Sequence, residues 1–168
     1  ADSRLRELAR TLFTKNAEEA KKINKEYQAA LELPGDPEKG KVIYMQSCAV
    51  CHQVKGENGI AFGPDLGTIH NWKKEDILAN ILDPNLSIMA GYDLWEINLN
   101  NGESLQGIIA AETSSAITIK NIGNFEKTIS RQDIKSLQSL SVSAMTVGLE
   151  KNISKEAMAD LIAFLRQN

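Results

Sequence analysis

The sequence predicts a mainly α fold with a small antiparallel β meander or barrel inserted into it. Apolar side chains recur three and four residues apart in several stretches before residue 83 and again after residue 153, which indicates helices with one buried face. Between about 92 and 140 the apolar residues alternate with polar ones instead, which is typical of half-buried strands. This change of period places a β insert inside a helical protein.

The first 33 residues predict a helical hairpin. One apolar stripe lies within 5–13 and a second within 20–31, and between them Asn16 and Glu19 have the spacing of a capping box. Pro34 and Gly35 end the second helix. We therefore treat 1–33 as a separate N-terminal segment and 34–168 as one domain.

Three more helices are predicted in the domain. Asp36 is a good N-cap and Pro37 suits a first helical turn, so a helix begins there and runs toward residue 48. A helix near 73–82 ends at Asp83-Pro84. The last helix starts at Ser154 and carries an apolar face.

The strands and the longest loop follow from turn residues. Glycines at 56, 59, 63 and 67 make 53–68 a loop. From Tyr92 the strands begin, Asn101-Gly102 forms a hairpin turn, Gly123-Asn124 forms another, and 134–140 adds a last strand.

Composition excludes several functional classes. Of the 168 residues, 42% are apolar and 24% are charged, as in ordinary globular proteins. The 19 basic and 22 acidic residues give a net charge of −3, so nucleic acid is a poor partner, and no apolar run is long enough for a membrane span. The chain starts without Met and without a signal-like segment, so we expect any export signal to have been removed or to lie outside it.

The two cysteines are the most informative residues. Cys48 and Cys51 are followed directly by His52, and C-x-x-C-H is the motif of c-type haem attachment. Two thiols three positions apart can each add across one vinyl group of the same haem, and the adjoining imidazole is a normal axial ligand. We therefore predict one covalent haem c, tethered by Cys48 and Cys51, with His52 as the proximal iron ligand.

Two other readings of the motif are weaker. A structural zinc site would need Cys48, Cys51, His52 and His70 together, but His52 follows Cys51 without the usual spacing between ligand pairs. A thioredoxin-like dithiol requires a strand before the motif, whereas a helix is predicted there. Haem attachment is the interpretation we retain.

The sixth ligand of the iron has several candidates. Met45 is too close to the cysteines to reach the opposite haem face, Met158 lies on an apolar helix face and suits a core position, and His70 suits the surface or a supporting role. Met145 and Met89 both lie in irregular segments. Met145, between the β insert and the last helix, is the favoured ligand, and Met89 is the alternative.

Several further segments of the chain carry short motifs before and after C-x-x-C-H. They are 40–44, 63–66, 81–84, 91–92, 101–102 with Gly107, 143–149 and 160–165. Together they resemble class I cytochrome c, in particular the haem-binding domain of planctomycete and verrucomicrobial proteins. The resemblance extends from about residue 35 to the end of the chain. It implies a class I cytochrome c helical core, with the β insert between the haem motif and the loop of the distal methionine.

The resemblance also assigns roles to single residues. It implies that Met145 is the distal ligand, that the carbonyl of Pro64 orients the His52 ring, and that Gly40 lets the first helix of the domain approach the last, where Tyr44 packs on Phe164. Thr146 stands where the family usually has proline, so the backbone of the ligand loop is less restricted here.

The predicted function is single-electron transfer by a mono-haem cytochrome domain that is not an enzyme by itself. The resemblance implies a periplasmic or exported location and a redox partner, either a separate protein or an upstream dehydrogenase domain for which 1–33 would be a helical tail. The β insert either covers a haem edge or docks a partner. The alternatives are a haem-based sensor or peroxidase-like enzyme with an open distal site, and a zinc-stabilised interaction module.

Overall fold

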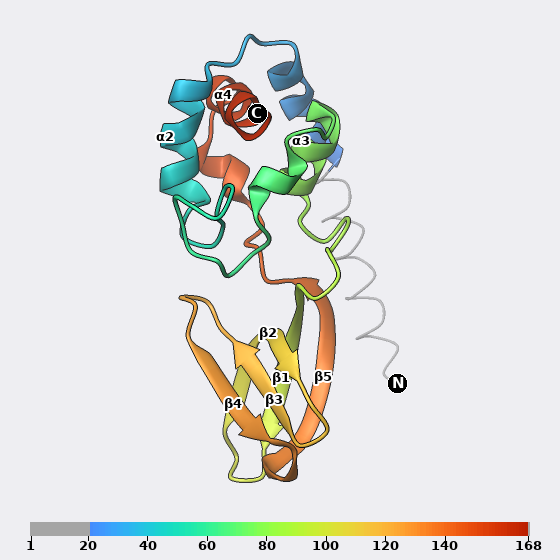
Figure 1. Cartoon of the computed structure of the whole chain (residues 1–168). Helices are drawn as coiled ribbons and strands as arrows, with labels where there is room; N and C mark the ends of the chain where they lie inside the picture. Colours follow the sequence, from blue (N-terminus) through green and yellow to red (C-terminus); the bar gives the residue numbers. More distant parts are fainter. Residues whose placement is uncertain (1–20, 168) are drawn as a thin grey trace, which may run out of the picture.

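The protein consists of a helical unit and a β unit that lie end to end (Figure 1). The structure is a computed structural model that describes residues 21–167. The helical unit comprises 21–92 and 144–167, and the β unit comprises 93–143. The first predicted N-terminal helix lies outside the described residues, whereas 21–27 are helical, as predicted for the second.

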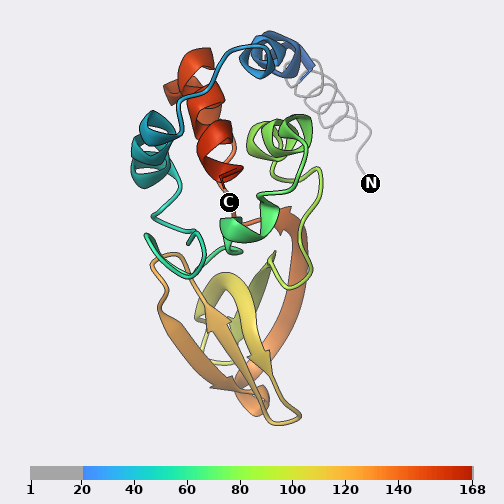
Figure 2. The same ribbon diagram turned by 45° about the horizontal axis from the view of Figure 1, so that its top comes forward.

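The helical unit is built from two segments that the β unit separates in sequence. Turned forward, the structure shows α4 between α2 and α3 (Figure 2). In chain order its elements after residue 27 are η1 (Gln28–Leu31), α2 (Pro37–Ser47), η2 (Leu66–Ile69), α3 (Lys74–Leu82), η4 (Leu149–Asn152) and α4 (Lys155–Leu165).

The predicted helix starts are confirmed. The Asp36 side chain accepts hydrogen bonds from the backbone N–H groups of Glu38 and Lys39, 3.0 and 3.4 Å away, and Pro37 is the first residue of α2. Ser154 caps α4 through the N–H of Ala157 at 3.2 Å. These caps fix where α2 begins and therefore where its far end presents the cysteines.

Close contact between α2 and α4 depends on Gly40. A Cβ atom at this position would lie 2.0 Å from the backbone oxygen of Asp160, so no larger residue fits without separating the helices. Further along, the rings of Tyr44 and Phe164 pack with centroids 5.3 Å apart. Both features confirm the contact predicted for this helix pair.

The β unit is a five-stranded antiparallel sheet within the described residues. The strand order is β4-β3-β2-β1-β5. Its strands are β1 (Asp93–Leu99), β2 (Ser104–Glu112), β3 (Ala116–Lys120), β4 (Glu126–Ser130) and β5 (Ile134–Ser143).

The sheet differs from a simple meander at its last strand. The first four strands pair in sequence order, but β5 pairs with β1, where Ile97 lies opposite Leu137. A single turn of 3-10 helix, η3 (Arg131–Asp133), carries the chain from the β4 edge to the β1 edge. β5 also continues to Ser143, beyond the predicted limit of 140, because its end pairs with Asp93 at the start of β1.

Each unit has its own hydrophobic core. In the helical unit residues from η1, α2, α3 and α4 pack together, with Tyr44, Met158 and Leu161 fully buried. The sheet surrounds a smaller cluster that includes Ile97 and Ile117. The insert therefore buries its apolar residues largely within itself.

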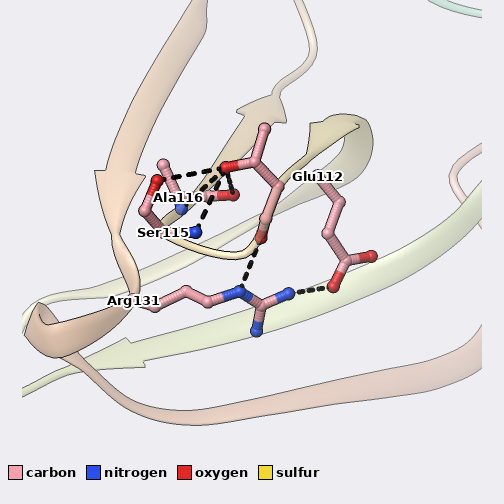
Figure 3. A network of polar contacts seen from close by, with 5 residues as sticks. Glu112, Ser115, Ala116 and Arg131 are labelled. Atoms are coloured by element: carbon pink, nitrogen blue, oxygen red, sulfur yellow. Dashed lines mark hydrogen bonds and ion pairs between the residues drawn. The ribbon is translucent and has the colours of Figure 1, made fainter.

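The far corner of the β unit is held by polar contacts. Arg131 donates from Nε to the carbonyl of Thr113 at 2.9 Å and forms an ion pair with Glu112 (Figure 3). Its backbone N–H donates to the carbonyl of Ser115 at 2.8 Å. Thr113 Oγ1 accepts the N–H of Ala116 at 3.0 Å. These contacts close the β2–β3 turn against η3.

The observed architecture is helices plus a separate antiparallel sheet, which confirms the β insert and leaves the description "mainly α" a prediction. Residues from η1 pack into the helical core, and the proposed division at 33 and 34 stays a prediction. In the described part of the chain, no helix has the length and apolar character needed to span a bilayer.

Candidate functional site

The C-x-x-C-H motif forms a tight turn at the end of α2. The N–H of Cys48 donates to Tyr44 O at 2.8 Å, and the N–H groups of Cys51 and His52 donate to Cys48 O at 3.0 and 2.9 Å. Both cysteines are free thiols and half-buried. The turn therefore holds the two thiols and the imidazole in one small region.

The His52 ring is fixed by a backbone carbonyl. Its Nδ1 lies 2.8 Å from the carbonyl oxygen of Pro64, which can only accept a hydrogen bond. Nδ1 therefore carries the hydrogen, and the lone pair of Nε2 is left available for a metal. Burial lowers the pKa of His52, although the hydrogen bond to Pro64 acts in the opposite direction. The environment thus favours the neutral imidazole that iron ligation needs.

The loop after the motif packs closely against this ring. The backbone N–H groups of Phe62 and Gly63 both donate to Cys51 O, at 3.1 and 2.6 Å. A Cβ atom at Gly63 would lie 2.5 Å from Cε1 of His52, so the ring occupies space that any other residue type would fill. Glycine at 63 is what lets Pro64 reach Nδ1.

Tyr44 and Asp65 hold the two ends of this loop. The Tyr44 hydroxyl donates to the His52 carbonyl at 2.6 Å, and burial raises the pKa of Tyr44 to about 12. The Asp65 carboxylate accepts the N–H groups of Lys55, Gly56 and Gly67 at 2.8, 2.6 and 2.7 Å. Burial alone would raise the pKa of Asp65, but these three hydrogen bonds outweigh it and lower the pKa.

Burial favours the protonated thiol form of both cysteines at neutral pH. Burial raises the pKa of Cys48 to about 11, with a further contribution from Cys51, and burial also raises the pKa of Cys51. Both side chains thus keep the S–H group that is added across a vinyl bond. Together with the oriented imidazole, these residues fit a covalently bound haem.

A zinc site finds no comparable support. Among residues 21–167, which include every cysteine and histidine of the chain, no three Cys, His, Asp or Glu side chains are grouped so that they could hold a metal ion. His70 instead directs Nδ1 to the carbonyl of Gly67 at 2.9 Å.

The methionines occupy different environments. Met158 is fully buried in the helical core, as predicted for a core residue. Met45 and Met89 are 49% and 42% exposed. Met145 is half-buried in the segment between β5 and η4, where its N–H donates to Ser143 Oγ at 3.1 Å. The role of Met145 as distal ligand, with Met89 as the alternative, stays a prediction.

Sequence reasoning missed three polar contributions to this region. It treated Tyr44 only as a packing residue, although its hydroxyl holds the His52 carbonyl. Asp65 could have been found, because an Asp two residues before a glycine is typical of a capped turn. Asn85, which contacts Ser143, carried no signal, because its partner is 58 residues away.

Comparison with known proteins agrees with this geometry. Residues 37–102 match the family model described as Cytochrome c, a segment that begins with α2, includes the C-x-x-C-H motif and α3, and ends in the β1–β2 turn. No curated protein matches the chain. The match supports a c-type cytochrome that works in haem-based electron transfer. It implies covalently attached haem c, for which Cys48 and Cys51 fit a single attachment site.

Proposed function

We propose that this chain is a mono-haem c-type cytochrome domain that passes single electrons between partners and performs no substrate chemistry by itself. Cys48 and Cys51 attach the haem, His52 is the proximal ligand and Met145 the distal ligand. Pro64 orients His52. The observation that carries this proposal is the His52 ring beside two thiols, with Nδ1 bonded to Pro64 and Nε2 available.

Each residue has a distinct part in holding the cofactor. When bound, haem c supplies an iron that takes up and releases one electron at a time. Each thiol adds across one vinyl group, sulfur to one carbon and hydrogen to the other, so the attachment needs no oxidant. Gly63 and Pro64 keep the imidazole in one orientation, and Tyr44 and Asp65 hold the loop that carries them.

Met145 is favoured as the distal ligand because its segment is anchored and partly buried, whereas the alternative, Met89, is 42% exposed. The anchor is Ser143, whose Oγ accepts the N–H of Met145. A thioether opposite an imidazole gives a six-coordinate iron suited to electron transfer. A sensor or peroxidase-like enzyme would need an open distal position.

The proposal also includes a redox partner and a cellular location. Cytochrome c domains usually pass electrons to redox partners and are generally exported. We assign this chain a periplasmic or exported location and a redox partner protein or an upstream dehydrogenase domain as its electron source. The β unit either shields a haem edge or presents a docking surface.

Mass and extraction test the cofactor, and one variant tests the distal ligand. The intact protein should weigh more than the bare chain by one haem, and acid-acetone should leave the colour on the polypeptide. Met145→Ala should abolish the weak sulfur-to-iron absorption band near the red end of the oxidised spectrum and open the reduced iron to carbon monoxide.

Met89→Ala is the matched control for this test and should leave both properties unchanged. If Met145→Ala keeps the band and Met89→Ala loses it, Met89 is the distal ligand. A native protein that binds carbon monoxide readily would point to the sensor or peroxidase class instead.

A further inference from the structure

We propose that Asn85 is a positioning residue for Met145. The N–H of Ser143 donates to Oδ1 of Asn85 at 2.8 Å, and the N–H of Met145 donates to Ser143 Oγ at 3.1 Å. Asn85 belongs to the segment that enters the β unit, and Ser143 to the segment that leaves it. This chain of two hydrogen bonds joins the segments where the β unit meets the helical unit.

The Asn85 end of this connection is firmly held by the helical unit. Asn85 follows Asp83, the C-cap of α3, and its N–H donates to Asp83 Oδ1 at 3.1 Å. Pro84 between them is buried, and α3 places Ile77 and Leu78 in the helical core. Asn85 itself is exposed, and the hydrogen bond to Asp83 ties its backbone to the end of a well-packed helix.

The Ser143 end has less support of its own. Asp93 pairs with Ser143 and Trp95 with Ser139, so residue 94 of β1 faces residues 140–142 of β5 and the ladder is interrupted there. Ser141 within this bulge has a positive φ of 54°, which is uncommon for a residue with a side chain. Regular strand pairing therefore stops at Ser139 and resumes only at Ser143, next to the Met145 segment.

Asn85 compensates for this interruption. Without its Oδ1 the N–H of Ser143 loses its side-chain acceptor, and the residue that anchors the Met145 backbone loses its connection to α3. The functional consequence rests on the proposed role of Met145 as iron ligand, whereas the hydrogen bond between the two segments does not.

The haem-loaded protein and three variants test this role. Asn85→Ala removes the acceptor, and Asn85→Asp keeps an oxygen at the same place and should rescue it. Asn100→Ala is the matched control, because Asn100 also makes a side-chain hydrogen bond to backbone, from Nδ2 to the carbonyl of Gln132 at 2.8 Å, within the β unit.

Amide exchange reports on the hydrogen bond, and the reduction potential and the sulfur-to-iron band report on its effect on the iron. In Asn85→Ala, amide hydrogen exchange over 141–147 should become about fivefold faster, as expected from loss of one ordinary hydrogen bond. The reduction potential should fall and the sulfur-to-iron band should weaken, because a thioether ligand raises the potential of haem. Asn85→Asp and Asn100→Ala should resemble the native protein in exchange over 141–147, potential and band.

Unchanged exchange in Asn85→Ala would overturn the proposal. So would faster exchange with the potential and band unaltered, because Asn85 would then hold the segment without positioning the ligand. If Met145→Ala keeps the band, the proposed ligand is wrong, and exchange over 141–147 still decides whether Asn85 holds this segment.

Discussion

The helical unit and the β unit use their polar side chains for different purposes. In the helical unit Tyr44, Pro64 and Asp65 all contact the loop or the ring of His52. In the β unit a network of polar contacts surrounds Arg131 (Figure 3), at the end of the unit that points away from the helices (Figure 1). One unit organises a site, and the other stabilises its own turns.

Within residues 21–167, side-chain hydrogen bonds join the two units at two places. Lys120 at the end of β3 donates to the carbonyl of Ala61, in the loop that carries Gly63 and Pro64. Asn85 accepts the N–H of Ser143 at the end of β5, which is an edge strand of the sheet. The two hydrophobic cores are separate. We therefore expect substitutions inside the sheet to change its own stability, and substitutions at the contacts of Lys120 and Ser143 to change the haem site.

A pair of core truncations gives the largest expected effects. Ile117 in the sheet and Leu161 in α4 are both fully buried, and replacing either by Ala should lower the free energy of unfolding by about 2–5 kcal/mol. Only Leu161→Ala should also alter the reduction potential, because its core carries α2 and the haem motif. Denaturant unfolding and redox titration of the haem-loaded variants measure the two effects.

The exchange rates of the strands provide the local check. Ile117→Ala should speed amide exchange in β1 and β3 and leave the haem spectrum as it was. If the reduction potential of Ile117→Ala shifts as much as that of Leu161→Ala, the two cores are coupled, which would contradict their independence.

Asp65 in the helical unit and Glu103 in the β unit are both hydrogen-bonded carboxylates, but we expect their substitution to affect stability differently. Three backbone N–H groups bind Asp65, so Asp65→Asn should cost about 1–3 kcal/mol of unfolding free energy at neutral pH. Hydrogen bonding to Lys127 also lowers the pKa of Glu103 in the β unit, but this pair is exposed. Glu103→Gln should therefore leave stability unchanged within error.

The pH dependence of stability distinguishes the same two residues. Because folding lowers the pKa of Asp65 below its ordinary value of 3.8, its contribution is present above pH 3.8 and is lost as the pH falls through the folded pKa. Asp65→Asn should thus flatten the stability curve below about pH 4. A native curve that matches the variant there would contradict the role assigned to this carboxylate.

The elements with local signals were predicted well. Asp36 and Pro37 mark the start of α2, Asp83-Pro84 marks the end of α3, and alternating residues mark the strands, because each signal acts within a few residues. Pairing of β5 with β1 was not predicted. It depends on which sheet edge is open after η3, and no local pattern encodes that.

The residues of the candidate site were likewise predicted where they are adjacent in sequence and missed where they are distant. Cys48, Cys51 and His52 are adjacent in sequence, so their chemistry could be inferred directly. Contacts such as that between Asn85 and Ser143 arise only once the insert has folded and its two ends meet, which a single sequence does not reveal. Met145 lies between these cases, because its segment was recognised by resemblance and its role as distal ligand stays a prediction.

The smallest expected effect concerns the hydroxyl of Tyr44. Tyr44→Phe keeps the ring contact with Phe164 and removes the hydrogen bond to the His52 carbonyl, so it should cost about 1 kcal/mol. Folding raises the pKa of Tyr44 from 10.0 to about 12, so its contribution is complete below pH 10 and is lost as the pH rises through about 12. The native protein should therefore lose more unfolding free energy than Tyr44→Phe between pH 10 and pH 12. Denaturant unfolding across that range measures the difference, and parallel curves would mean that the hydroxyl does not support the turn of the haem motif.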